Sequence, residues 1–272
     1  MVTRFAPSPT GELHLGHAYA AKVAHDLARK SGGRFLLRHE DIDSSRVREE
    51  YFLKIEEDLQ WLGLDWDGEI LRQSSRQAAY SEALGKLKEM DMVYPCFCTR
   101  RDIQAALSAP HGNETAIYPG NCRGISIDEA EQRIASGAAH SWRLDAGKAA
   151  ETHGRLSFDD LRFGKISVEL SVNGDAVLAR KDIGIAYHLA VVVDDEFQKI
   201  THVTRGDDLL GATHIHRQLQ AILSFQEPIY LHHACVCGEN GKRLAKRDDA
   251  RSIRSLRDEG FSPVETIAMA QP

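Results

Sequence analysis

The sequence predicts an α/β protein built around a doubly wound, mostly parallel β-sheet of the Rossmann type. Two observations predict this class. Short apolar runs alternate with amphipathic helical patterns over residues 1–95, and the same alternation resumes after residue 178. In addition, a loop rich in Pro and Gly joins the first apolar run to the first helical pattern, and a helix N-terminus entered in this way suits a phosphate group.

The first half of the chain contains three strand–helix pairs. Short apolar runs predict strands at 2–6, 34–38 and 69–72, and apolar positions on one helical face predict helices at 15–30, 45–62 and 75–90. Gly32 and Gly33 end the first helix. The second strand brings His39 and Glu40 to its carboxyl end, which is where ligands bind in open α/β sheets.

The middle of the chain has a looser pattern, which we interpret as an insertion. Short strands are expected there around 141–144, 156–158 and 166–171. The alternation resumes with an apolar run at 188–195 that is typical of a parallel strand buried on both faces, then a helix at 211–224 and a strand at 229–236. The predicted division has a first Rossmann half, an insertion, a second half, and a basic loop with a tail of about one helix: 1–95, 96–177, 178–240 and 241–272.

The composition excludes several classes of protein. Of the 272 residues, 42% are hydrophobic and 27% are charged, as in ordinary globular proteins. No apolar run approaches the roughly 18–20 residues of a membrane span, and there is no secretory signal, so we expect a cytoplasmic monomer without membrane contact. The net charge of −6 argues against broad binding of nucleic acid but allows a local basic patch. Its candidates are Lys242, Arg243, Lys246, Arg247, Arg251, Arg254 and Arg257.

Two motifs near the ends of the chain carry the strongest functional signal. At the start of the first predicted helix, His14 and His17 flank Gly16, and imidazoles there can donate hydrogen bonds to a phosphate as charge builds on it. Near the other end, the segment 241–247 is a glycine-started basic loop that could close over a triphosphate. Each motif alone could be a helix cap or a solvated charge run. Their joint occurrence favours a nucleotide site.

The five cysteines favour thiols or a metal over disulfides, because their number is odd. Cys96, Cys98 and Cys122 are separated by short spacings with turn residues and can supply most of a tetrahedral zinc shell. On ligand chemistry alone, His111 would be the fourth ligand. Cys235 and Cys237 lie in the run predicted as a core strand, where buried thiols are the better interpretation.

The two terminal motifs resemble the signatures of the class I aminoacyl-tRNA synthetases. Residues 14–17 match the first signature, and residues 243–247 match the second, of the Lys-Met-Ser-Lys-Ser type, with Arg243 in place of Lys and Ala245 in place of Ser. The resemblance implies a synthetase-type Rossmann catalytic domain that uses ATP with Mg²⁺. It implies catalytic roles for His14, Gly16, His17 and Lys246, and ATP binding by His14, His17, Arg243 and Lys246.

Further stretches are similar to the glutamyl branch of this family, at 4–11, 36–41, 190–195 and 201–208. Guanidinium groups suit the two carboxylates of glutamate because they bind them bidentately. The resemblance implies that Arg4 and Arg205 hold the carboxylates and that Glu40 faces the ammonium group, while which arginine takes which carboxylate stays open. The implied glutamate-binding set is Arg4, Phe5, Ala6, Pro7, Ser8, Glu40, Tyr187 and Arg205.

The cysteine spacing and the short tail narrow the resemblance to a truncated paralogue family, the glutamyl-queuosine tRNA(Asp) synthetases. That family activates glutamate with ATP and attaches it to queuosine in the anticodon stem-loop of tRNA(Asp). The resemblance implies one structural zinc held by Cys96, Cys98, Tyr118 and Cys122, and no anticodon-binding domain. The candidates for contacts with tRNA phosphates are Arg243, Arg247, Arg251 and Arg254.

Three alternatives remain open at this point. Ala18, Tyr19 and Ala20 follow the second histidine as in full-length glutamyl-tRNA synthetases, which keeps a truncated or fragmentary enzyme that charges tRNA(Glu) as the near alternative. A non-catalytic paralogue that binds tRNA or an amino acid would be expected to have lost a motif histidine or Lys246. A nucleotidyltransferase for small metabolites would have no reason to carry the glutamate set.

Overall fold

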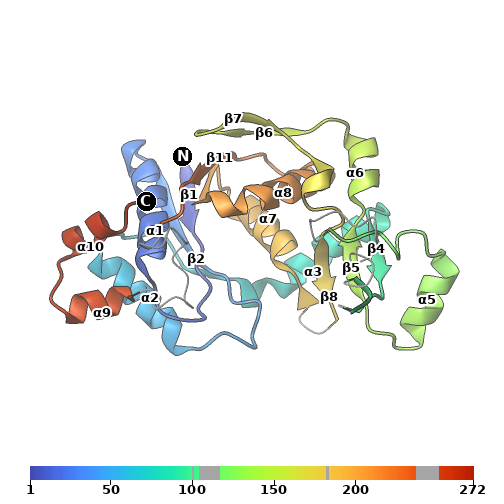
Figure 1. Cartoon of the computed structure of the whole chain (residues 1–272), viewed down its shortest axis with the longest axis horizontal. Helices are drawn as coiled ribbons and strands as arrows, with labels where there is room; N and C mark the ends of the chain where they lie inside the picture. Colours follow the sequence, from blue (N-terminus) through green and yellow to red (C-terminus); the bar gives the residue numbers. More distant parts are fainter. Residues whose placement is uncertain (100, 104–116, 182–183, 237–250) are drawn as a thin grey trace.

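The computed structural model describes residues 1–99, 101–103, 117–181, 184–236 and 251–272. The molecule is elongated (Figure 1), and different parts of the chain form its two ends. Helices α9 (Ile253–Asp258) and α10 (Pro263–Met269) lie at one end, and α5 (Ile127–Ala135) lies at the other.

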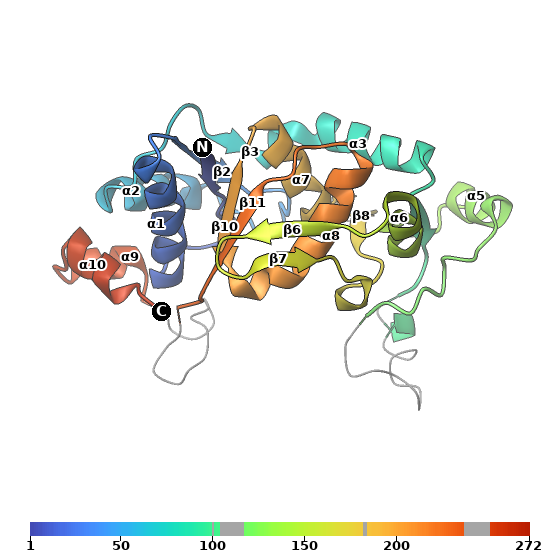
Figure 2. The same cartoon turned by 90° about the horizontal axis from the view of Figure 1, so that it is seen from above.

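A parallel arrangement of strands forms the centre of the fold, as predicted. The strands β1, β2 and β3 pair in that order, and a second set pairs in the order β10-β11-β6-β7. The amide of Thr201, just before β10, donates to the carbonyl of Val2 at 3.0 Å, so β1 lies beside β10 and the two sets continue one another (Figure 2). Among the described strand pairs of these two sets, only β6–β7 is antiparallel. The strand bounds are β1 (Val2–Phe5), β2 (Arg34–His39), β3 (Leu71–Arg72), β6 (Ser157–Asp160), β7 (Gly164–Ser167), β10 (His202–Gly206) and β11 (Ile229–His233).

The first two helices follow the predicted pattern with one shift. Helix α1 (Leu15–Lys30) has the predicted bounds, and it packs against β1 and β2 through a stripe of small buried residues that includes Ala21 and Ala28. Helix α2 (Glu50–Trp61) begins five residues later than predicted. The amide of Arg48 donates to the carbonyl of Pro9 at 3.1 Å, so the residues just before Glu50 are held against the loop that follows β1 and do not join the helix.

The prediction of a strand at 188–195 was wrong, because this segment forms helix α7 (Tyr187–Phe197). A continuous apolar run does not distinguish a buried strand from a helix that is buried on all sides. Here α7 is enclosed by α3 (Gln77–Glu89), α8 (Leu210–Ile222) and β8 (Val177–Arg180), and it is buried continuously from Leu189 to Asp195. The missed strand is β10, which carries the polar sequence His202–Gly206.

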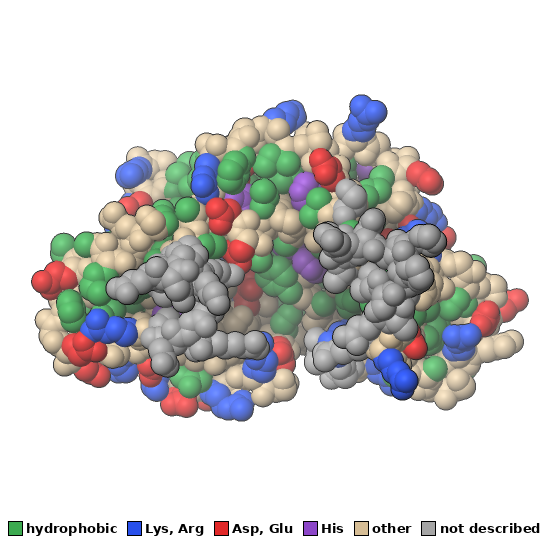
Figure 3. Space-filling view, in the orientation of Figure 1, with side chains coloured by type: hydrophobic (Ala, Val, Ile, Leu, Met, Phe, Trp, Pro, Cys, Tyr) green, Lys and Arg blue, Asp and Glu red, His purple; other side chains and the backbone are tan. Residues whose placement is uncertain are grey.

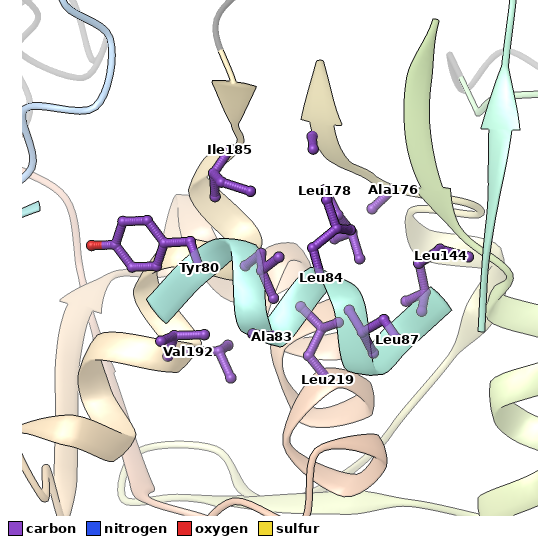
Figure 4. Packing of buried hydrophobic residues seen from close by; sticks show 14 of the residues in the cluster. Tyr80, Ala83, Leu84, Leu87, Leu144, Ala176, Leu178, Ile185, Val192 and Leu219 are labelled. Carbon is purple, nitrogen blue, oxygen red and sulfur yellow. The ribbon is translucent and has the colours of Figure 1, made fainter. Parts of the chain in front are cut away.

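A separate antiparallel sheet is formed by β4 (Val93–Cys96), β5 (Ser141–Leu144), β8 and β9 (Gly184–Ile185), so strands from the predicted insertion and from the ends of both predicted Rossmann halves take part in it. Side chains of α3, including Leu84 and Leu87, pack between this sheet and the helices α7 and α8 (Figure 4). The β6–β7 hairpin also falls within residues 96–177, but it pairs with β11. The remaining elements are η1 (Gln73–Arg76), α6 (Ala146–His153), η2 (Leu170–Val172) and η3 (Asp207–Leu209).

The C-terminal tail contains two short helices rather than the single helix predicted. Ser252 caps α9, and Ser262 with Glu265 forms a capping box at the start of α10. Ile253 and Ala270 are buried against the apolar face of α1, so the tail packs onto the first half of the chain.

Candidate active site

A pocket of about 420 Å³ lies at the carboxyl ends of β1 and β10, beside the N-terminus of α1. It brings together nearly all the described residues that the sequence nominated for catalysis and for glutamate binding. These are Arg4, Phe5, Ala6, Ser8, His14, Gly16, His17, Glu40, Tyr187 and Arg205. Lys246 and Arg243 lie outside the described residues. Pro7 is buried behind the pocket, and its carbonyl accepts the amide of Glu40 at 3.0 Å, which ties the loop after β1 to the end of β2.

His14 and His17 form a reciprocal cap at the start of α1. The Nδ1 atom of His14 accepts the amide of Gly16 at 3.1 Å, the Nδ1 atom of His17 accepts the amide of His14 at 3.2 Å, and the ring centroids lie 3.8 Å apart. A neutral imidazole that accepts at Nδ1 carries its proton at Nε2. The cap therefore fixes both rings in the tautomer that donates from Nε2, at the helix end that suits an anion.

Gly16 makes this close cap possible. A Cβ atom built on Gly16 would lie 3.0 Å from Cε1 and 3.2 Å from Nδ1 of His14. A side chain would therefore press on the ring that caps the helix. The requirement for glycine here is one of space, and it arises from the position of the imidazole.

Arg4 is held in the pocket wall by a buried carboxylate. Its Nε atom lies 3.0 Å from Oδ1 of Asp195, and Nη1 of Arg38 lies 2.8 Å from the same oxygen. Burial raises the pKa of Asp195, but the two guanidinium groups lower that pKa by more, so the net shift is downward. Asp195 is therefore an anion shared by two buried cations.

Glu40 is positioned from the other side of the same network. Its Oε1 atom lies 3.2 Å from Nη2 of Arg38. Burial raises the pKa of Glu40 above its ordinary value, although Arg38 and Arg4 act against that change. Burial also raises the pKa of the Tyr187 phenol, so this group is a hydrogen-bond donor in the pocket.

Asp195 and Arg38 were not nominated as site residues from the sequence. They lie in motif stretches, but their roles depend on contacts across more than 150 residues of chain. A usable signal was present in Asp195, because a carboxylate at the end of a continuous apolar run must find a cation once it is buried.

The charged groups of this pocket suit an amino acid as ligand. Comparison with known proteins identifies the family of the chain. The model of the class I tRNA synthetases (E and Q), catalytic domain, matches residues 1–271. The chain is 47% identical to the glutamyl-Q tRNA(Asp) synthetase of Rhodobacter capsulatus, over 97% of this chain and 98% of that relative. The chain belongs to the class I tRNA synthetases of the E and Q type, in the glutamyl-Q tRNA(Asp) group.

Other similar proteins agree with this assignment. The glutamyl-Q tRNA(Asp) synthetase of Nitratidesulfovibrio vulgaris is 42% identical, over 94% of this chain and 81% of that relative. The structure of a glutamate tRNA ligase from Elizabethkingia meningosepticum in complex with its amino acid is 27% identical, with a TM-score of 0.83. The match covers 99% of this chain and 60% of that one. The enzyme is therefore a ligase of the class I aminoacyl-tRNA synthetase type.

A second site lies in the segment between the Rossmann halves. The Sγ atoms of Cys96, Cys98 and Cys122 lie within 4.8 Å of one another, with 3.5 Å between Cys98 and Cys122. Thiolates about 2.3 Å from a tetrahedral zinc ion stand about 3.8 Å apart, so this donor set fits the ion. The Tyr118 hydroxyl lies 3.3 Å from Sγ of Cys96 and 3.6 Å from Sγ of Cys98, while His111 lies outside the described residues.

Cys235 is not a buried core residue. The strand β11 ends at His233, and Cys235 lines the active-site pocket with its Sγ atom 3.3 Å from Oδ1 of Asp208. Cys237 lies outside the described residues. The interpretation of Cys235 as a core thiol was therefore wrong, because the strand stops before it.

The expected basic face of the tail is also different in the structure. Arg251 precedes α9 and pairs with Glu259, so it does not share a helix face with Arg254 and Arg257. Arg254 lies 2.5 Å from Glu57. In Figure 3, Lys and Arg side chains are interspersed with Asp and Glu on the face shown, rather than gathered into one basic surface. Arg243 and Arg247 lie outside the described residues.

Within the described ranges, no helix has both the length and the apolar character that crossing a membrane requires.

Proposed function

We propose that this enzyme activates glutamate with ATP and then transfers the glutamyl group to queuosine in the anticodon stem-loop of tRNA(Asp). The observation that carries the first step is a single pocket lined by the guanidinium groups of Arg4 and Arg205, the carboxylate of Glu40 and two imidazoles at a helix start. The near full-length identity to glutamyl-Q tRNA(Asp) synthetases supports the acceptor.

In the first step, a carboxylate oxygen of glutamate attacks the α-phosphorus of ATP, and pyrophosphate leaves. Arg4 and Arg205 bind the carboxylates, with hydrogen bonds from Ser8 and Tyr187, and Glu40 binds the ammonium group. His14 and His17 donate from Nε2 to the phosphate oxygens as charge develops on them. Lys246 and Arg243 bind the triphosphate, and Mg²⁺ accompanies it.

In the second step, a hydroxyl group of the queuosine base attacks the carbonyl carbon of glutamyl-adenylate. An ester forms and AMP leaves with the bonding electrons, while the hydroxyl proton passes to a base. The near alternative is charging of tRNA(Glu), and the similarity to the glutamate tRNA ligase structure is the observation that favours it. Both candidates share the first step, so they differ only in the acceptor.

Pyrophosphate exchange tests the activation step. We expect the purified enzyme to exchange labelled pyrophosphate into ATP when glutamate is present, and to do so without tRNA, because the proposed glutamate-binding residues already lie together around one pocket in the structure without tRNA. Glutamine should support much less exchange, since its side chain carries a neutral amide where glutamate has a charged carboxylate that can pair with a guanidinium. Absence of exchange with glutamate, with or without tRNA, would reject the proposed activation.

We also propose that the cysteine cluster binds one structural zinc ion, with Tyr118 as the fourth ligand. The amide of Cys122 donates to the Tyr118 hydroxyl oxygen at 3.0 Å, and the Arg143 guanidinium lies 3.8 Å from the Tyr118 ring centroid. The amide of Cys122 favours negative charge on that oxygen, whereas burial and the three neighbouring thiols raise the pKa of the Tyr118 hydroxyl. A site closed by four protein ligands leaves no position for substrate, so the ion stabilises the fold.

Elemental analysis tests this zinc site. We expect about one zinc per chain in protein purified without a chelator. Cys122→Ser should lose most of the metal, whereas the matched control Cys235→Ser should keep it. Tyr118→Phe should weaken retention of the metal under a chelator. A zinc-free wild-type protein would reject the site, and loss of the metal in a His111 variant but not in Tyr118→Phe would reassign the fourth ligand.

A further inference from the structure

The guanidinium of Arg205 is held by groups that carry no negative charge. Its Nε atom donates to Nε2 of His232 at 3.2 Å, its Nη1 atom lies 3.1 Å from Nδ1 of His216, and its Nη2 atom donates to the hydroxyl of Thr213. All four residues are buried. In the part of the chain that the structure describes, no carboxylate lies within ion-pairing distance of Arg205.

The protonation states of these groups follow from their contacts. A guanidinium has no acceptor, so each imidazole nitrogen that faces it must present a lone pair. His232 accepts at Nε2, and its protonated Nδ1 donates to Oδ2 of Asp160 at 2.6 Å. His216 accepts at Nδ1, and its protonated Nε2 donates to Nδ1 of His188 at 3.1 Å.

The carboxylate of Asp160 lies on the far side of the His232 imidazole from Arg205. Its Oδ1 atom accepts the amides of Arg162 and Phe163 at 2.8 and 2.9 Å, and its Oδ2 atom accepts the amide of His232 at 3.0 Å as well as the imidazole proton. The imidazole of His232 therefore separates the negative charge from the guanidinium.

Arg4 provides the contrast within the same pocket. Arg4 is held by the carboxylate of Asp195, which fixes its position and cancels much of its charge. A carboxylate would form stronger hydrogen bonds to Arg205 than an imidazole does. Hydrogen bonds to two imidazoles hold Arg205 less strongly than a carboxylate would, but they leave its positive charge available to a ligand.

We propose that His216 and His232 are positioning residues. They hold the Arg205 guanidinium in place without neutralising its positive charge, so that this charge is directed to a carboxylate of the substrate. This inference rests on the proposed function, because it requires glutamate as the substrate. It assigns a role to two histidines that do not line the pocket. Thr213 also helps to hold Arg205 in place, since its hydroxyl accepts from Nη2 of Arg205 and lies 2.9 Å from Nε2 of His232.

The test compares replacement of His216 by glutamine and by glutamate, two side chains of nearly the same shape that differ in charge. His216→Gln keeps a neutral acceptor near Arg205, whereas His216→Glu supplies a charged one. Because a hydrogen bond to a charged group is worth more than a neutral one, we expect His216→Glu to raise the KM for glutamate in pyrophosphate exchange about 10- to 100-fold above that of His216→Gln. The KM for ATP should change much less. A purely structural defect would instead raise the KM for glutamate and the KM for ATP together.

His214→Gln is the matched control, because it lies on the same helix but accepts the amide of Glu169 and contacts Phe158. Its KM values should remain those of the wild type. If His216→Glu does not fold, Thr213→Val, which removes the hydroxyl at constant shape, should raise the KM for glutamate relative to Thr213→Ser. Equal KM values within the pairs would overturn the inference. Absence of exchange by the wild type would instead reject the proposed function.

Discussion

Replacing His14 or His17 by alanine is expected to lower the rate of glutamate-dependent pyrophosphate exchange about 10²- to 10³-fold, because each change removes a donor that is held ready for the transition state. The reciprocal cap explains why both rings matter, since each accepts an amide at Nδ1 and so directs a proton from Nε2. The rates are measured at saturating glutamate and ATP. Lys246→Ala is expected to have a similar effect, on the sequence motif alone.

The control separates catalysis from capping. Asparagine is among the best N-cap residues, and losing a cap altogether costs about 1 kcal/mol. His14→Asn should therefore keep the thermal stability of the wild type while losing the rate. If His14→Asn exchanged pyrophosphate at the wild-type rate, His14 would be only a helix cap, and the assignment of the nucleotide site would be wrong.

Replacing Asp195 by alanine is expected to destabilise the fold by about 3–5 kcal/mol, because it leaves two guanidinium groups without their buried anion. Arg38 is fully enclosed, and its remaining partners are Glu40 and Gln198. Chemical denaturation measures the loss. Glu196→Gln, at the next position of α7, removes the charge that pairs with the exposed Lys199 just after the helix and should cost less than about 1 kcal/mol, as surface pairs usually do.

The pH dependence of this contribution has a definite sign. The pKa of Asp195 is lower in the folded protein than in the unfolded chain, where a carboxyl group titrates near about 3.9. The stabilisation is therefore fully present above that pH, and it is lost as the pH falls through the lower folded value. An Asp195→Ala variant as stable as the wild type at neutral pH would contradict the network.

Much of the fold could be predicted because its signals are local. The helix at 15–30 has its apolar stripe and both of its ends in the sequence, and its bounds are confirmed. The segment 188–195 could not be assigned in the same way, because a helix and a strand that are buried on all sides have the same composition. Only packing against α3, α8 and β8 decides between them.

The residues of the candidate site also fall into those that the sequence predicted and those that it did not. Site residues that belong to the matched sequence motifs could be identified from the sequence, because each motif also fixes where its residues lie in the fold. The groups that hold them, Asp195 behind Arg4 and His216 behind Arg205, come from other elements. Their roles arise from tertiary contacts, and the sequence does not show which partner each of them contacts.

The central claim concerns the acceptor, and transfer of labelled glutamate tests it most directly. The enzyme is incubated with ATP, labelled glutamate and one of three RNAs, which are tRNA(Asp) that carries queuosine, tRNA(Asp) from cells unable to make queuosine, and tRNA(Glu). We predict that label becomes attached only to the queuosine-containing tRNA(Asp). Efficient labelling of tRNA(Glu) at its 3′ end, with none on queuosine-containing tRNA(Asp), would contradict the account and identify a glutamyl-tRNA synthetase instead.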